Sequence, residues 1–227
     1  MGNQQTVPLC VRSMVRILRP PCVACHFSVE EETPLFAADL NFAFAHGGPL
    51  TRAFLKSIPL DRHAGVVVDS SLVWLSPGLA HALTPAGPLS GPRGPVAFVH
   101  EPFPGVMTGV RGESNRNREA LHRLCVFGID AAPEVVEGKL AFATSAEAEE
   151  FWFPTESLAF REQEIARRLA ERSLRLTPLP SATIVEFGWG TLLRPRPAAT
   201  HGFQFVVRVT SGDRRPHVNG LRNHAQL

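Results

Sequence analysis

The stretch Phe203-Gln-Phe-Val-Val-Arg-Val209 decides the fold, because its apolar side chains alternate with the two-residue period of a β-strand. Every second residue from Phe203 to Val209 is Phe or Val, and these residues share one face. The other face carries Gln204, Val206 and Arg208. An arginine among such neighbours lies either at an exposed edge of a sheet or in a polar cavity.

Further strands are predicted upstream of this one from β-branched runs of strand length. They cover residues 64–69, 72–75, 95–99 and 183–187. Residues 76–95 are rich in proline and glycine, and a loop of this length inside a compact domain is usually functional or disordered.

Helices are predicted from capping signals and from helical spacing of apolar residues. Pro49 suits the first position of a helix over residues 47–57, since its missing N–H costs nothing there. Thr144 and Glu147 fit a capping box before a short acidic helix that ends at Trp152. The other helices are expected at residues 115–125 and 156–176.

The order of strands, a helical insertion and strands again predicts an α+β fold. The expected architecture is a distorted jelly-roll, or double-stranded β-helix, with helices packed on its outside. A plain α+β sheet is the alternative. Residues 1–34 are expected to form a flexible N-terminal arm, because prolines and a run of glutamates punctuate them, and residues 35–227 a single domain.

Composition limits the classes of function. The chain has 227 residues, of which 44 % are hydrophobic and 19 % charged, and its net charge is +2 at pH 7. This balance is typical of a globular protein and argues against a strongly electrostatic nucleic-acid binder. No apolar run reaches the roughly 18 residues of a membrane-spanning helix, and no secretory leader is visible, so a cytoplasmic protein without a membrane partner is expected. The alternative of a nucleic-acid contact would use Arg194, Arg196, Arg214, Arg215 and Arg222.

The motif Cys22-Val-Ala-Cys25-His26 has the spacing of a c-type haem attachment site. The same residues could instead form half of a zinc site, with Cys10 as a third thiolate. A third interpretation is a chance spacing in the N-terminal arm.

Two further polar groups could bind ligands. His100 and Glu101 come at the end of a predicted strand and could ligate a metal ion, although neighbours on a strand point to opposite faces. Asn115, Arg118 and His122 share one face of a predicted helix and could grip a phosphate or carboxylate. Each of these residues could equally be an ordinary surface or core side chain.

The C-terminal run carries a resemblance to a known family. Residues 184–198 read Ile-Val-Glu-Phe-Gly-Trp-Gly-Thr-Leu-Leu-Arg-Pro-Arg-Pro-Ala, and residues 202–208 read Gly-Phe-Gln-Phe-Val-Val-Arg. These segments resemble the closing strands of the iron(II)/2-oxoglutarate-dependent dioxygenases, which have a jelly-roll fold. In that family a His on a late strand ligates iron, and a later Arg binds the distal carboxylate of 2-oxoglutarate. Residues 68–78 resemble the approach to the family's His-x-Asp pair.

The resemblance implies Fe(II) and 2-oxoglutarate as cofactors and an oxidoreductase that acts on a small organic molecule. Arg208 stands at the position of the co-substrate arginine, with Arg194 as a nearby auxiliary. Leu193 stands where the family has its late histidine, and the His-x-Asp pair is missing.

Leucine cannot ligate a metal, so an active enzyme would have to hold iron facially with other residues. The candidates for this role are His81, His100 and Glu101. The alternative is a pseudoenzyme on the same fold, which binds a small-molecule ligand or a protein partner.

Overall fold

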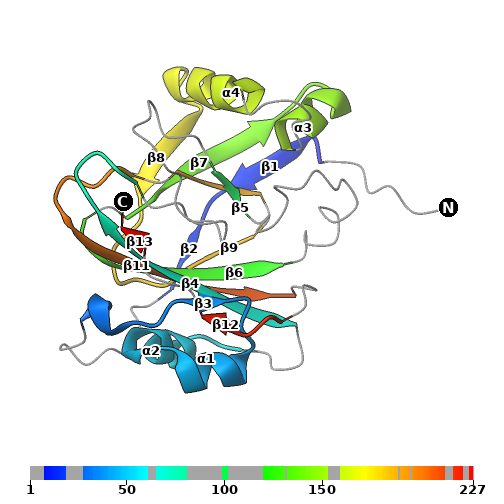
Figure 1. The fold of residues 1–227 in the computed structure, drawn as a ribbon. Coiled ribbons are helices and arrows are strands. Elements are labelled where there is room, and N and C mark those ends of the chain that lie inside the picture. Colours follow the sequence, from blue (N-terminus) through cyan, green and yellow to red (C-terminus); the bar gives the residue numbers. More distant parts are fainter. Residues whose placement is uncertain are drawn as a thin grey trace.

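Two sheets pack face to face, and a pair of helices covers the outer side of each (Figure 1). The computed structural model describes residues 8–18, 28–60, 65–80, 99–101, 120–130, 132–152, 159–188, 190–194, 196–212, 217–221 and 225–226. Among these residues the strand pairs are antiparallel apart from the pair of β13 (Ala225–Gln226) with β4 (Val66–Leu75), so the α+β class is confirmed with mostly antiparallel sheets. Among the described residues, no helix is both long enough and apolar enough to cross a membrane.

The larger sheet, sheet B, is built around the strand that the alternating sequence predicted. In spatial order its strands are β13 (Ala225–Gln226), β4 (Val66–Leu75), β11 (Gly202–Ser211), β6 (Leu121–Gly128), β9 (Val185–Phe187) and β2 (Arg16–Ile17). β11 pairs with β4 from Gly202 opposite Leu75 to Ser211 opposite Val66. β6 pairs along the other edge of β11, which makes β11 a central strand.

The smaller sheet, sheet A, lies on the other side of the central core. Its strands are β1 (Cys10–Ser13), β5 (Val99–Glu101), β7 (Glu134–Ala141), β8 (Leu174–Pro178) and β10 (Thr191–Arg194). β7 pairs with β1, β8 and β10, and β10 pairs in turn with β5. A separate short ribbon joins β3 (Leu35–Phe36) to β12 (Gly220–Leu221).

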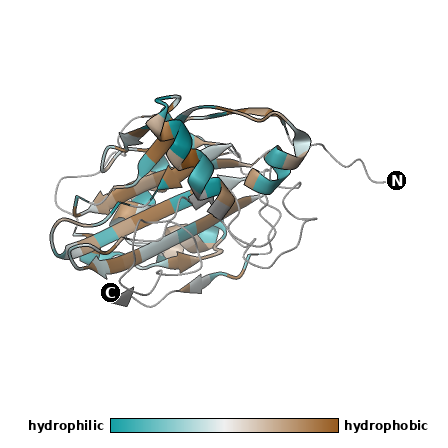
Figure 2. Cartoon of the chain, turned by 90° about the horizontal axis from the view of Figure 1, so that it is seen from above, coloured by the Kyte–Doolittle hydropathy of each residue, from teal (hydrophilic) through white to brown (hydrophobic). Residues whose placement is uncertain are grey.

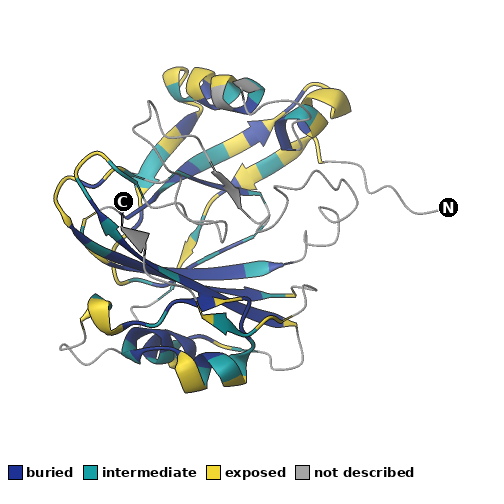
Figure 3. Ribbon diagram, viewed as in Figure 1, coloured by how far each residue is buried: buried dark blue, intermediate teal, exposed yellow. Residues whose placement is uncertain are grey.

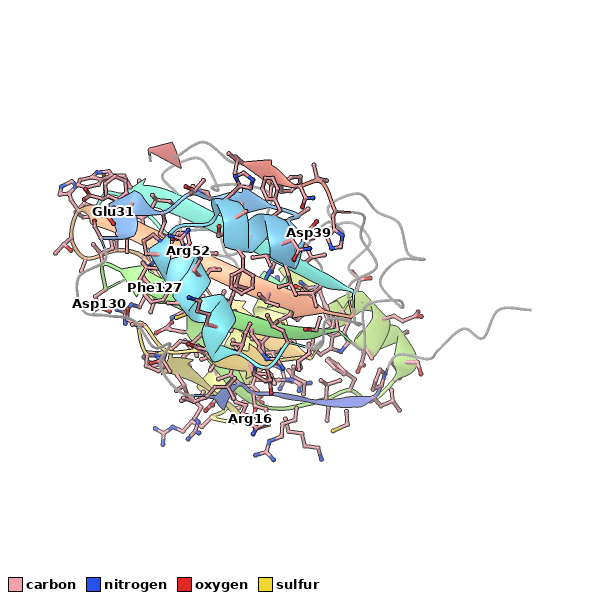
Figure 4. The ribbon with its side chains drawn as sticks, turned by 90° about the horizontal axis from the view of Figure 1, so that it is seen from below. Arg16, Glu31, Asp39, Arg52, Phe127 and Asp130 are labelled. Atoms are coloured by element: carbon pink, nitrogen blue, oxygen red, sulfur yellow. The ribbon has the colours of Figure 1, made fainter. Side chains whose placement is uncertain are left out.

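The helices lie on the outer faces. Helices α1 (Leu40–His46) and α2 (Pro49–Ser57) cover sheet B, and Figure 4 views the sheet from their side. Helices α3 (Ser145–Trp152) and α4 (Ala159–Ala170) cover sheet A. Figure 2, which views the molecule from the side of α3 and α4, shows hydrophobic and hydrophilic residues mixed along these two helices, as amphipathic packing requires. A short 3₁₀ helix, η1 (Val29–Glu31), precedes β3.

Three apolar clusters hold the layers together. One packs Phe205, Val207 and their neighbours against α1 and α2. A second packs sheet A against α3 and α4 around Trp152. The third lies between the sheets, where Val206 of β11 meets Leu193 of β10. Figure 3 shows the result as nearly continuous burial along β4, β6 and β11, the central strands of sheet B.

Several predicted elements are confirmed. Helix α2 begins at Pro49, the capping box precedes α3, and β4, β9 and β11 lie on the predicted runs. In the capping box the Glu147 amide donates to Thr144 Oγ1 at 3.2 Å, and the Glu147 carboxylate accepts from the Ala143 amide at 3.0 Å. Strand β5 begins where the run over residues 95–99 ends. Residues 95–98 and 81–94 of the predicted loop lie outside the described part of the chain.

The predicted helix over residues 115–125 is wrong for its described part, because Leu121–Gly128 forms strand β6. Leu124 and Val126 enter the core between the sheets, whereas Cys125 and Phe127 pack toward the outer helices. A strand buried on both faces is apolar at successive positions, and its spacing then also fits a helix. Residues 111–119 lie outside the described part.

The predicted helix over residues 156–176 is too long at its C-terminal end. Helix α4 ends at Ala170, and Arg172 takes a positive φ of 58° that an α-helix cannot continue through. The chain then forms β8, where Arg175 pairs with Glu137 of β7. Within α4, Glu164 and Arg168 form an ion pair at 2.5 Å.

The described residues before residue 35 contribute to both sheets, whereas the sequence predicted a flexible arm there. β1 pairs with β7, and β2 pairs with β9. Ser13 is fully buried, and its hydroxyl accepts a hydrogen bond from the Leu192 amide at 3.0 Å. Short strands of this kind are stabilised by the sheet that they join and leave little periodicity in the sequence. Residues 1–7 and 19–27 lie outside the described part.

A buried carboxylate caps the N-terminus of α2. Glu32 is 2 % exposed and accepts hydrogen bonds from the Leu50 amide at 2.5 Å, the Thr51 amide at 3.2 Å and the Thr51 hydroxyl at 2.8 Å. Gly48 lies so close that a Cβ there would stand 2.6 Å from the carboxylate. The negative charge also complements the dipole of the helix. Burial raises the pKa of the Glu32 carboxyl, and these hydrogen bonds oppose the increase.

Replacing this cap should weaken the fold. In Glu32→Gln an amide NH2 replaces a carboxylate oxygen that accepts a hydrogen bond, so the free energy of unfolding should fall by about 1–3 kcal/mol. Urea denaturation measures the loss. Glu31→Gln at the exposed neighbouring position is the control and should change stability by less than about 0.5 kcal/mol. Equal effects of the two substitutions would contradict the capping role.

Candidate functional site

A row of buried polar side chains lies on the face of sheet B that looks toward sheet A. We call it the inner polar row, and it consists of Asp69, His122, Gln204, Arg208 and Thr210. Val206 of the same β11 face packs against sheet A, and strand alternation places the other members beside it. Asp69 is 5 % exposed, and the other members are 3 % exposed or less.

Arg208 is the centre of this row. It lies opposite Asp69 of β4 and Leu124 of β6 in the strand register. Its Nη2 stands 3.8 Å from Asp69 Oδ2, which is longer than an N–H···O hydrogen bond. The sequence left open whether this arginine lies at an exposed edge or inside. The structure places it inside, on a central strand.

The Asp69 carboxylate is also held from its other side. Its Oδ1 accepts a hydrogen bond from the Ala37 amide at 3.0 Å. Ala37 belongs to the segment that runs along the edge of β4, where Ala38 forms a β-bridge with Val68. The carboxylate therefore balances the charge of Arg208 while a backbone amide fixes its position.

Next to Arg208, His122 and Thr210 form a polar pair. His122 Nδ1 lies 3.0 Å from Thr210 Oγ1, and the two residues are opposite each other in the strand register. The His122 ring stacks on Phe187 with centroids 5.3 Å apart. Because the strand rises about 3.3 Å per residue, Thr210 lies roughly 7 Å from Arg208 along β11. The inner face thus offers a cation and a hydrogen-bonding pair at a spacing that suits a small ligand.

Buried charges of this kind are costly for stability. Each ion loses several kcal/mol of hydration on entering the interior, and apolar residues of similar volume often stabilise a core at least as well. Charged groups that are kept inside therefore mark candidate sites for function. A second buried arginine, Arg123 of β6, lies on the opposite face of sheet B. Its Nε donates a hydrogen bond to the Glu186 carboxylate at 2.9 Å.

Leu193 occupies the position where the dioxygenase family has an iron-ligating histidine, and its surroundings are apolar. Leu193 is fully buried and packs with Val135 of β7 and Val206 of β11. Among the described residues, no group of three or more His, Cys, Asp or Glu side chains could hold a metal ion. The described residues therefore do not fit an iron(II) site at this position.

Of the other predicted metal ligands, the structure describes only the backbone of His100 and Glu101. His100 and Glu101 are consecutive residues of β5, paired in register with Leu192 and Thr191 of β10. Their side chains lie outside the description, as does the whole of His81. The proposed role of these residues stays a prediction.

Arg194, the predicted auxiliary to Arg208, lies on the other side of sheet A. It follows Leu193 on β10, shares the outer face with Leu192, and pairs with Glu134 of β7 through Nε at 2.8 Å. Its side chain is 32 % exposed. The structure therefore does not bring Arg194 and Arg208 together.

The remaining sequence candidates lie mostly beyond what the structure describes. The Cys22, Cys25 and His26 motif is outside the described residues, and Cys10 is exposed on β1. Asn115 and Arg118 are also outside, and His122 is on strand β6 instead of a helix.

Comparisons with protein-family models, with curated proteins and with solved structures each found no match. A function for this chain therefore has to be argued from its own residues and their geometry.

The sequence singles out Arg208, and it names His122 as a candidate for binding a phosphate or carboxylate from a predicted helix. It does not identify Asp69 or Thr210 as site residues, and the structure places His122 on strand β6. One signal was present: Val66-Val-Val-Asp-Ser-Ser-Leu-Val-Trp-Leu75 carries polar residues inside an otherwise apolar strand. Only the strand register shows that Asp69 lies opposite Arg208.

The 3.8 Å gap between Asp69 and Arg208 can be tested by comparing two ion pairs in one sheet. A double-mutant cycle with Asp69→Asn and Arg208→Gln should give a coupling energy smaller than the cycle with Glu186→Gln and Arg123→Gln. The expected difference is about 1–2 kcal/mol, because Arg123 Nε donates to Glu186 at 2.9 Å, whereas Arg208 Nη2 stands 3.8 Å from Asp69 Oδ2. Urea unfolding of the single and double variants measures both couplings. An equal or larger coupling for Asp69 and Arg208 would contradict this expectation.

Proposed function

We propose that this protein binds a small organic carboxylate between its two sheets, with Arg208 as the binding cation, and that it does so without iron held at position 193. It would then be a non-catalytic relative of the jelly-roll iron(II)/2-oxoglutarate dioxygenases. The observation that carries the proposal is the Arg208 guanidinium, which is 3 % exposed and lies on the inner face of a central strand.

The chemistry of the inner face supports a carboxylate ligand. A guanidinium presents a planar fork of N–H donors that matches the two oxygens of a carboxylate. In the interior such a pair is screened far less than at the surface. Thr210 and His122 lie at a distance that suits a second polar group of the ligand. A short dicarboxylate such as 2-oxoglutarate or succinate has this form.

The position of Leu193 supports binding over iron catalysis. An iron(II) oxygenase holds its metal with two histidines and one carboxylate, and a leucine in an apolar cluster supplies neither a ligand nor a polar neighbour. The other candidate function is an active dioxygenase with iron held by His81, His100 and Glu101. It is favoured by the pairing of β5 with β10, which puts the backbone of Val99 next to Leu193.

Ligand binding can be tested by thermal shift and calorimetry on metal-free protein. Titration with 2-oxoglutarate or succinate should raise the melting temperature in a concentration-dependent way, since a ligand of the native state stabilises it by mass action. The neutral diester of succinate should give no shift. Arg208→Gln should abolish binding, and Arg208→Lys should weaken it at least about tenfold because a lysine lacks the fork.

Arg123→Gln is the matched control, because it removes a buried arginine from the opposite face of the same sheet. It should lower stability but leave the dissociation constant unchanged. Binding that survives Arg208→Gln would overturn the proposal. An anaerobic titration with iron(II) should add no further shift. A shift with iron that 2-oxoglutarate enlarges would replace the proposal with the active dioxygenase.

A further inference from the structure

Strand β1 lies at the margin of sheet A, next to β7, and no described strand pairs with its other edge (Figure 1). The Phe142 amide donates to the Leu9 carbonyl oxygen at 2.9 Å, so Leu9 and every second residue after it bond to β7. The backbone N–H and C=O groups of Cys10 and Arg12 therefore point away from β7. A strand edge of this kind is a template for pairing with another extended chain.

Two cations face each other across β1 and β7. Arg12 is directly opposite Lys139 in the strand register, and both residues are exposed. The neighbouring pair, Val11 and Leu140, packs under α3 and α4, so the two cations lie on the opposite face of sheet A. Their Cα atoms are about 4.5 Å apart, because side chains approach most closely where the two residues exchange no backbone hydrogen bonds. Like charges placed directly opposite each other destabilise a sheet.

The described acidic residues do not balance these two charges. No ion pair joins Arg12 or Lys139 to any residue that the structure describes. Glu137 lies on the same face of β7 as Lys139, but its carboxylate accepts from Arg175 Nε at 2.8 Å and from the Thr177 hydroxyl at 2.9 Å. Both of these partners belong to β8, on the other edge of β7. The free edge of β1 therefore combines unpaired backbone groups with an uncompensated pair of cations.

We propose that the free edge of β1 binds an extended acidic segment of a partner protein, which adds a strand to sheet A and places a carboxylate beside Arg12. The backbone groups of Cys10 and Arg12 pair with the added strand and provide affinity, and the positive charge selects acidic side chains. Lys139 strengthens the positive potential at the same place. Leu9 and Met14 are exposed on either side of this position and offer apolar contacts.

An acidic peptide fits this edge better than the other possible occupants. Strand β1 of a second copy would bring no negative charge, because residues 1–29 contain no Asp or Glu. A phosphate polymer would pair with the cations but has no regular row of N–H donors for the outward carbonyl groups of the strand. An extended acidic peptide satisfies both the charges and the backbone groups. Binding at β1 does not involve Arg208, so it stands independently of the proposed function.

NMR titration of the whole 227-residue chain with three short peptides tests the proposal. In the first peptide glutamate alternates with threonine, which favours strands. In the second, lysine replaces glutamate, and the third is the first peptide with N-methylated backbone amides. The first peptide should bind and slow hydrogen exchange at the Cys10 and Arg12 amides. The second should not bind because the cations repel it, and the third should not bind because it has lost the N–H donors.

Substitutions at the cation pair test the choice of charge. Arg12→Gln should raise the dissociation constant of the glutamate peptide about three- to fivefold, the usual effect of one cross-strand charge pair. Arg12→Glu combined with Lys139→Glu should make the protein bind the lysine peptide in place of the glutamate peptide. Arg16→Gln is the matched control, because Arg16 is an exposed cation nearby in the sequence but lies on β2 of sheet B. It should change the dissociation constant by less than about twofold.

Three results would overturn the proposal. Equal binding of the N-methylated peptide would show that charge attracts the peptide without strand addition. An equal loss of affinity in Arg12→Gln and Arg16→Gln would show that the positive charge of the whole N-terminal segment is responsible. If Arg12 only protects the edge from pairing, the glutamate peptide will not bind, and Arg12→Gln will self-associate in analytical ultracentrifugation.

Discussion

The pairing of β11 with β4 and β6 is the constraint on which the rest of the structure depends. β11 is hydrogen-bonded along both edges, and side chains from both of its faces are buried. Phe205 and Val207 hold the outer helices on one face, and Val206 meets sheet A on the other. A shift of one residue in this strand would exchange the two faces and place Arg208 among the apolar residues under α1 and α2. The same register therefore fixes the core and the position of the buried cation.

The parts of the fold that could be predicted carry a local signal. Alternation identified β11, and the capping box and Pro49 identified the starts of α3 and α2. β6 could not be recognised, because a strand buried on both faces has no alternation and Leu121, Leu124 and Cys125 also fit helical spacing. The strands before residue 35 depend on long-range pairing with β7 and β9, which no local pattern shows.

Two residues of the candidate site were named from the sequence, Arg208 and His122, although His122 was expected on a helix. Arg208 stands out in the sequence because a cation interrupts an apolar strand. Asp69 and His122 join it through register, at separations of more than 80 residues. The resemblance to the dioxygenases drew attention to Leu193, and the structure gives this position an apolar environment. A buried cation on the same face of β11 as Val206, which belongs to one apolar cluster with Leu193, is consistent with binding a carboxylate without iron at position 193.

The most direct test of this account is a crystal structure of the protein grown with 2-oxoglutarate and without metal. The account predicts a carboxylate group of the ligand within hydrogen-bond distance of the Arg208 guanidinium, with Asp69 still bound to the Ala37 amide. An interior without ligand at saturating 2-oxoglutarate would contradict it.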